Sequence, residues 1–175
     1  MGTAIMTKIL VVEDETDIRE LLVDILGDAG YDVVVASDGG AALAVVTQEQ
    51  PDIILLDVMM PVIDGLQVLR VLKGDPATCA TPVIMVSAKS QEQEVREAKD
   101  AGAWDYLVKP WESGDVEAKV ARAQGSAPGG HLAGGEKSPV LGGVQAQAYL
   151  DVREKESLET GVVDMLDGVA EDDDR

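Results

Sequence analysis

The chain has 175 residues, of which 46% are hydrophobic and 27% charged, so it has room for one domain with an additional segment and is not disordered throughout. Its formal net charge of −19 argues against direct nucleic-acid binding, because an acidic surface repels phosphate backbones. One cysteine and one histidine exclude an internal disulfide, a cysteine cluster and a multi-histidine metal site.

Strands and helices are predicted to alternate from residue 8 to residue 123. The first strand, Lys8–Val12, is a short apolar run, and the helix after it has Thr16 or Asp17 as a candidate cap and Gly30 as its end. The later elements are expected, in chain order, as strand Tyr31–Ala36, helix Ala41–Gln48, strand Asp52–Asp57, helix Leu66–Lys73, strand Pro82–Val86, helix Glu92–Ala101, strand Trp104–Val108 and a weaker helix Asp115–Ala123. Apolar strands that alternate with helices predict an α/β fold with a doubly wound, five-stranded parallel sheet.

Three features toward the C-terminus depart from this pattern. Gly114 and the polar Glu117 predict that the last helix is short, mobile or dependent on a partner. Residues 124–143 are rich in glycine and are expected to form a flexible linker. Residues 144–175 form an acidic tail, for which a disordered segment, an amphipathic helix and a small folded module all stay open. Residues 1–7 are expected to be a leader outside the domain.

The chain holds no apolar stretch of about 18 residues, the length that spans a membrane. Its first residues also lack the charged start and the apolar stretch of a signal peptide. A cytoplasmic location without membrane contact is therefore expected.

Acidic residues stand where two of the predicted strands end. Glu13 and Asp14 follow the first strand, and Asp57 ends the third. Ligands of an open parallel sheet bind beyond the carboxyl ends of its strands, so these side chains are expected to converge. Carboxylates in one place repel one another unless a cation neutralises them, and oxygen ligands of this kind suit Mg²⁺. The sequence therefore predicts a magnesium site at this edge.

A hydroxyl and a lysine stand at the same edge. Ser87 follows the fourth strand and Lys109 the fifth. Opposite a bound cation, a lysine and a hydroxyl can contact two oxygens of a phosphoryl group, which makes Asp57 a candidate nucleophile that forms an aspartyl phosphate. Each of these residues alone is more simply a turn cap or a surface charge. Their convergence favours the site.

Four segments resemble the receiver domain of two-component response regulators. They are Ile9–Glu15, Asp57–Gly65, Val86–Ala88 and Asp105–Pro110, and the resemblance covers residues 8–123. It implies the flavodoxin-like fold, bound Mg²⁺, and phosphorylation by a sensor histidine kinase or a histidine phosphotransfer protein. It also implies a shift between inactive and active forms of the domain.

The resemblance assigns a role to individual residues. The phospho-acceptor is Asp57. The metal ligands are Glu13, Asp14, Asp57 and the backbone carbonyl of Met59. The phosphoryl contact and the switch residues are Lys109, Ser87 and Tyr106. The residues that shape the loops are Pro61, Gly65 and Pro110, the last after a cis peptide bond.

The main functional expectation is a signalling module that acts through protein contacts and is not itself an enzyme, beyond assisting its own phosphorylation and dephosphorylation. The residues after 123 hold no basic recognition helix that would bind nucleic acid. Two alternatives stay open: a phosphate shuttle to a histidine phosphotransfer protein, and a transcriptional regulator that recruits a partner through the acidic tail. A homodimer on activation is also open. A haloacid-dehalogenase-like phosphatase is disfavoured, because that family has a second Asp where this chain has Met59.

Overall fold

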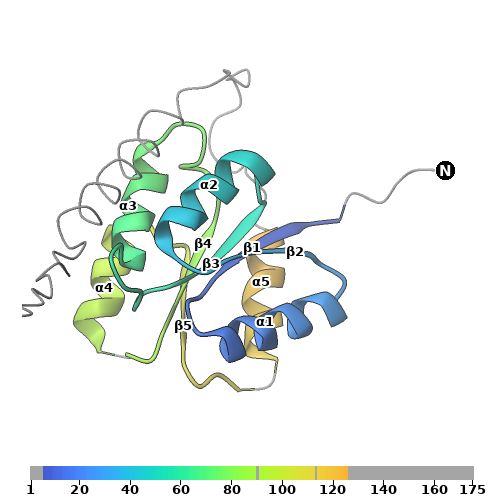
Figure 1. Cartoon of the computed structure of the whole chain (residues 1–175). Helices are drawn as coiled ribbons and strands as arrows, with labels where there is room; N and C mark the ends of the chain where they lie inside the picture. The colour runs from blue at the N-terminus through green and yellow to red at the C-terminus, as the bar shows by residue number, and fades with distance from the viewer. Residues whose placement is uncertain (1–5, 90, 113, 126–175) are drawn as a thin grey trace, which may run out of the picture.

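The computed structural model describes residues 6–89, 91–112 and 114–125. In this part of the chain, a five-stranded parallel sheet runs through the centre of the molecule (Figure 1). The strands are β1 (Lys8–Val12), β2 (Asp32–Ala36), β3 (Ile53–Asp57), β4 (Val83–Ser87) and β5 (Asp105–Val108), in the spatial order β2-β1-β3-β4-β5. The strand order reverses next to β1, so the carboxyl ends of β1 and β3 lie side by side.

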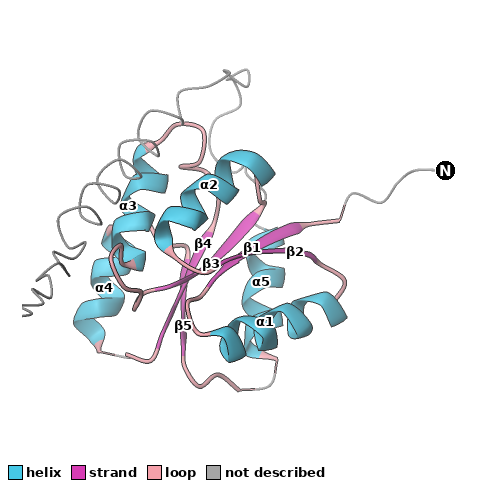
Figure 2. Cartoon of the chain, viewed as in Figure 1, coloured by secondary structure: helices cyan, strands magenta, loops and turns pink. Residues whose placement is uncertain are grey.

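Five helices cover the two faces of the sheet (Figure 2). They are α1 (Thr16–Asp28), α2 (Gly39–Glu49), α3 (Gly65–Gly74), α4 (Glu92–Asp100) and α5 (Asp115–Gly125). Buried side chains of α2, α3 and α4 join one core cluster, and those of α1 and α5 join the other. Each predicted strand and helix is present, so the doubly wound α/β fold is confirmed.

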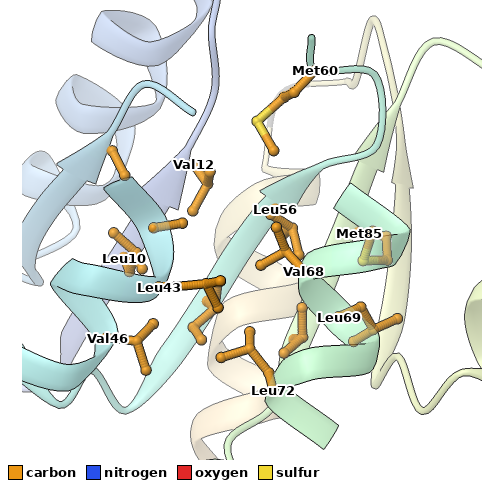
Figure 3. Close-up of a cluster of buried hydrophobic side chains, with 14 of the residues drawn as sticks. Leu10, Val12, Leu43, Val46, Leu56, Met60, Val68, Leu69, Leu72 and Met85 are labelled. Carbon is orange, nitrogen blue, oxygen red and sulfur yellow. The ribbon is translucent and has the colours of Figure 1, made fainter. Parts of the chain in front are cut away.

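The three central strands β1, β3 and β4 are buried on both faces, as their apolar runs predict, whereas the edge strand β2 is partly exposed. Along β1, Leu10 and Val12 belong to one cluster, and Ile9 and Val11 belong to the other (Figure 3). All five residues of β3 are buried. Burying one such branched side chain stabilises the fold by about 2 kcal/mol. The two clusters therefore hold the central strands, and with them the strand ends, in fixed positions.

The predicted caps of α1 are partly wrong. Glu15 is the N-cap residue and makes no side-chain capping bond, whereas Thr16 is already the first helical residue. The turn after β1 is too short for Thr16 or Asp17 to stay outside the helix. Gly30 follows the helix as predicted, with a left-handed φ of 87° that favours glycine.

The expectation of a short last helix is also wrong, whereas its mobility and its dependence on a partner stay predictions. Helix α5 has 11 residues, and its Val116, Val120 and Ala123 are buried. Gly114 precedes the helix with a φ of 88°, so its flexibility does not weaken a helical turn. The helix continues two residues past the predicted boundary at residue 123.

The far ends of the described chain are tied together. Gln124 donates to the hydroxyl of Thr7 and accepts from Tyr31, which joins the end of α5 to the residue before β1. The predictions for residues 1–5 and 126–175 lie outside the described residues. Within the described ranges, no helix has the length and apolar composition needed to cross a membrane.

Candidate functional site

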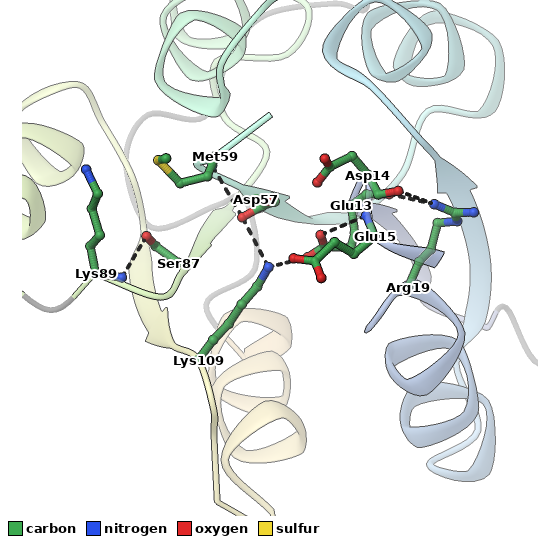
Figure 4. Close-up of polar contacts among 9 residues, drawn as sticks. All are labelled: Glu13, Asp14, Glu15, Arg19, Asp57, Met59, Ser87, Lys89 and Lys109. Atoms are coloured by element: carbon green, nitrogen blue, oxygen red, sulfur yellow. Dashed lines mark hydrogen bonds and ion pairs between the residues drawn. The ribbon is translucent and has the colours of Figure 1, made fainter. Parts of the chain in front are cut away.

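The three predicted carboxylates meet at the carboxyl edge of the sheet. Glu13, Asp14 and Asp57 each offer an oxygen, and these oxygens lie within 4.8 Å of one another. Figure 4 shows the three side chains close together. Glu13 and Asp57 are buried, whereas Asp14 is exposed. Adjacent strands β1 and β3 bring the three residues together although 43 positions separate Asp14 from Asp57 in the chain. The predicted convergence of acidic side chains is therefore present.

Lys109 reaches into this cluster from the end of β5. Its Nζ lies 2.7 Å from Oε2 of Glu13 and 3.3 Å from Oδ1 of Asp57. The Lys109–Pro110 peptide bond is cis, as the resemblance implies. One ammonium group balances only one of three carboxylates, so these four side chains keep a local negative charge that would favour a further cation.

Burial and charge raise the pKa of Asp57 from its ordinary 3.8 to about 7. Desolvation is the largest cause, and the negative charge of Glu13 adds to it. Lys109 and the N–H of Met59 act in the opposite direction and favour the charged form. Asp57 is therefore an acid whose ionisation is held back by its surroundings and would be promoted by a cation.

The pKa of Lys109 is raised, although burial alone would lower it. The hydrogen bond to Glu13 and the negative charges of Asp57 and Glu13 outweigh the cost of desolvation. Lys109 therefore stays positively charged between the two buried carboxylates. Its ammonium group can therefore form an ion pair with an anionic group attached to Asp57.

The loop between β3 and α3 wraps closely around Asp57. The N–H of Met59 donates to Oδ1 of Asp57 at 3.4 Å. A Cβ at Gly65 would collide with the backbone carbonyl of Asp57, so only glycine fits there. Pro61 accepts a hydrogen bond from Ile63 at 2.9 Å, which closes a tight turn over Val62. The part that the carbonyl of Met59 would play toward a metal stays a prediction.

Ser87 and Tyr106 are joined through the backbone of Lys89. The N–H of Lys89 donates to Oγ of Ser87 at 3.1 Å, and the hydroxyl of Tyr106 donates to the carbonyl of Lys89 at 3.0 Å. Ser87 is fully buried and Tyr106 is 8% exposed, so the tyrosine ring points inward. A movement of Ser87 would therefore displace the backbone of Lys89 and change the hydrogen bond from Tyr106.

Arg19 was missed from the sequence, and Lys89, which stands two positions after Ser87 and flanks the site, makes a contact that the sequence did not predict. Arg19 donates to the backbone carbonyls of Glu13 and Asp14 from the first turns of α1. Lys89 pairs through its Nζ with Oε1 of Glu94 on α4, at 2.9 Å. Neither contact follows from helical or strand periodicity. The short spacing from Asp14 to an arginine on the next helix is the one signal that could have found Arg19.

The donor set fits a hard divalent cation. All the candidate side-chain donors are carboxylate oxygens, the atoms that Mg²⁺ prefers, and they stand close enough to share one ion. Burial and the negative charge of Glu13 raise the pKa of Asp57, and a cation at this place would act in the opposite direction. Glu13, Asp14 and Asp57 would hold such an ion. Bound there, it would offset their repulsion and attract a phosphoryl oxygen.

Comparisons with known proteins agree with this arrangement. The family described as the response regulator receiver domain matches residues 9–121. The DNA-binding dual master transcriptional regulator RpaA of Synechocystis sp. is 42% identical over 119 residues, which make up 68% of this chain and 48% of that protein. The alkaline phosphatase synthesis transcriptional regulatory protein PhoP of Bacillus subtilis is 42% identical over 113 residues, 65% of this chain and 46% of that protein. The chain thus spans about half the length of these curated relatives.

Solved structures show the same fold. The chemotaxis protein CheY4 of Vibrio cholerae has a TM-score of 0.65 and 33% identity, with 67% of this chain and 98% of that chain covered. The receiver domain of NtrX from Brucella abortus has a TM-score of 0.64 and 32% identity, with 68% and 99% covered. The likeness therefore takes in nearly all of those chains and about two thirds of this one.

Proposed function

The chain belongs to the response regulator receiver domain family, and from this premise we propose that its folded domain accepts a phosphoryl group on Asp57. The donor would be the phosphohistidine of a sensor histidine kinase or a histidine phosphotransfer protein. One observation carries the proposal: Asp57 is buried beside Glu13, Asp14 and Lys109 at the carboxyl edge of the sheet. Phosphorylation would be assisted by Mg²⁺.

The transfer needs an ionised Asp57. An oxygen of its carboxylate forms a bond to phosphorus while the bond between phosphorus and the donor's imidazole nitrogen breaks, and the imidazole leaves with the electron pair. Because the pKa of Asp57 is about 7 in the free domain, part of the population is protonated near neutral pH. Lys109 lies 3.3 Å from Asp57 and would place its charge on a phosphoryl oxygen.

The response would pass through Ser87 to Tyr106. The Ser87 hydroxyl accepts from Lys89, which leaves its own proton free to donate to a phosphoryl oxygen on Asp57. A shift of Ser87 would move the Lys89 backbone and so alter the bond from Tyr106. Tyr106 lies on β5 and its partner Lys89 on the loop before α4, so the proposed output is a changed surface around these elements.

A small phosphoryl donor tests the proposal without knowledge of the kinase. We expect the full-length chain, incubated with phosphoramidate and Mg²⁺, to gain the mass of one phosphoryl group, and a chelator to prevent the gain. Asp57→Asn should remove the labelling. Asp24→Asn, which changes an exposed carboxylate on α1, is the matched control. Labelling that persists in Asp57→Asn would refute the assignment of Asp57.

A second candidate function is transcriptional regulation. It is favoured by the names of the curated relatives, which describe DNA-binding or transcriptional regulators. The net charge led to the expectation that direct nucleic-acid binding is unlikely, and the names of these relatives do not support that expectation. Fluorescence anisotropy of labelled duplex DNA, with the full chain and with and without beryllofluoride, tests this second candidate. Binding that appears only with beryllofluoride would favour regulation of transcription by direct contact.

A further inference from the structure

A guanidinium group holds the backbone from which the acidic pair projects. Nη1 of Arg19 donates to the carbonyl of Glu13 at 2.8 Å and lies 3.4 Å from the carbonyl of Asp14. Nη2 of the same side chain donates to the hydroxyl of Thr16 at 3.3 Å. Arg19 therefore spans the turn between β1 and α1, and its side chain is half-buried.

The same turn is closed from its other side. The N–H of Glu15 donates to Oε1 of Glu13 at 3.2 Å, and the N–H of Arg19 donates to the carbonyl of Glu15 at 2.9 Å. These bonds fix one carboxylate oxygen of Glu13 and leave Oε2 directed at Lys109. The acidic pair thus starts from a backbone that several hydrogen bonds hold in one conformation.

Asp14 depends on this backbone more than Glu13 does. Glu13 is buried, accepts a hydrogen bond through Oε1 and is ion-paired with Lys109 through Oε2, whereas Asp14 is exposed. Among the contacts of the described residues, none holds the carboxylate of Asp14 itself. Its direction is therefore set by the backbone of the turn, on which Arg19 acts.

From this geometry we propose that Arg19 is a positioning residue for the divalent cation site. This inference rests on the proposed function, because it concerns the same metal-binding carboxylates. Figure 4 shows Arg19 on the side of the acidic pair that faces away from Asp57 and Lys109. Its donors are engaged by carbonyl and hydroxyl oxygens, which leaves the carboxylates to the ion.

The proposal opposes a simpler electrostatic expectation. A positive side chain near the site repels a cation, so its removal by charge alone would tighten metal binding. The positioning role predicts the reverse. Loss of a group that orients metal ligands typically weakens metal binding about 10- to 100-fold. Arg19 acts on the backbone rather than on a ligand atom, so we expect about tenfold, the lower end of that range.

The test is a titration of the full-length chain with Mn²⁺, followed by the electron paramagnetic resonance signal of the free ion. Arg19→Met should bind Mn²⁺ about tenfold more weakly than the wild type. Arg19→Lys keeps the charge and can still donate to one of these oxygens, so it should bind Mn²⁺ more tightly than Arg19→Met. Arg96→Met is the matched control, because it removes an arginine from the exposed face of α4, where its ion pair within the described part of the chain is with Glu92. Its affinity should not change.

A second readout separates positioning from general damage to the fold. With a small phosphoryl donor, Arg19→Met should need more Mg²⁺ for half-maximal labelling but reach the wild-type rate at saturating Mg²⁺. A rate that stays low at saturation, or Mn²⁺ binding that is unchanged or tighter, would overturn the proposal. If Arg19→Met does not fold, as judged by circular dichroism, wild-type affinity in Arg19→Ala or Arg19→Gln that does fold would overturn it equally. A wild-type chain that binds no Mn²⁺ would instead refute the proposed function.

Discussion

Replacing Asp57 by asparagine should stabilise the metal-free domain at alkaline pH. Asp57 is 2% exposed, and its pKa is raised to about 7 by burial and by Glu13. The unfolded chain releases the same proton near the ordinary value of 3.8. Between these two values the folded form binds more protons than the unfolded form, so the free energy of unfolding of the wild type falls as pH rises.

The size of the effect follows from the difference in pKa. A pKa difference of one corresponds to about 1.4 kcal/mol. The rise of the Asp57 pKa from 3.8 to about 7 therefore lowers the free energy of unfolding by about 4 kcal/mol once Asp57 is ionised. Asparagine keeps the shape and an acceptor for Met59, and the pKa of about 7 already includes the opposing attraction of Lys109. The expected gain for Asp57→Asn is therefore about 4 kcal/mol above pH 7.

The assay is urea denaturation of both proteins in the presence of a chelator, at about pH 8.5 and about pH 5. The advantage of Asp57→Asn should shrink by about 1.4 kcal/mol for each pH unit below 7 and be gone near pH 4. Added Mg²⁺ should stabilise the wild type and have less effect on the variant. Asp24→Asn, at an exposed position of α1, is the control.

Two results would refute this reasoning. A stability difference that is the same at both pH values would show that ionisation of Asp57 is not its cause. A variant that is less stable than the wild type at alkaline pH would show that the bonds from Lys109 and Met59 outweigh desolvation.

Three further predictions concern single residues around the site. Lys109→Ala should still be labelled by a small phosphoryl donor, but beryllofluoride should no longer change the hydrogen exchange of β5. If the exchange of β5 still changes, Lys109 is not needed for the response. Gly65→Ala should lower the free energy of unfolding, measured with urea, by about 3 kcal/mol, because the added methyl group collides with the Asp57 carbonyl. Gly74→Ala is the control, because a Cβ at Gly74 has no atom within 4 Å. Val62→Gly should raise the free energy of unfolding by about 1 kcal/mol, because valine at a φ of 69° is strained. If the variant is less stable in the same measurement, the packing of the valine side chain contributes more than the backbone strain costs.

The elements of the fold follow from local patterns. Each strand is a short apolar run and each helix has apolar residues at helical spacing, and these signals depend only on neighbours in the chain. The errors lie at the turns. The first residue of α1 and the length of α5 were predicted wrongly, because the conformation of Glu15 and of Gly114 depends on the packing of the helices that follow.

The candidate site was predictable for a topological reason. Parallel strands present their carboxyl ends at one edge, so Glu13, Asp14, Asp57, Ser87 and Lys109 were expected to meet before any contact was known. The contacts themselves were not predictable. The reach of Arg19 to two backbone carbonyls, and the link from Ser87 to Tyr106 through Lys89, depend on rotamers and on the course of a loop.

The amino-acid sequence by itself determined the order of strands and helices and the kind of chemistry at the strand ends, because hydrophobic period and residue type are properties of the chain. Only the tertiary structure decided how acidic Asp57 is. That value depends on how much water the surrounding elements exclude and on the charges of Glu13 and Lys109, which the fold brings from distant parts of the chain.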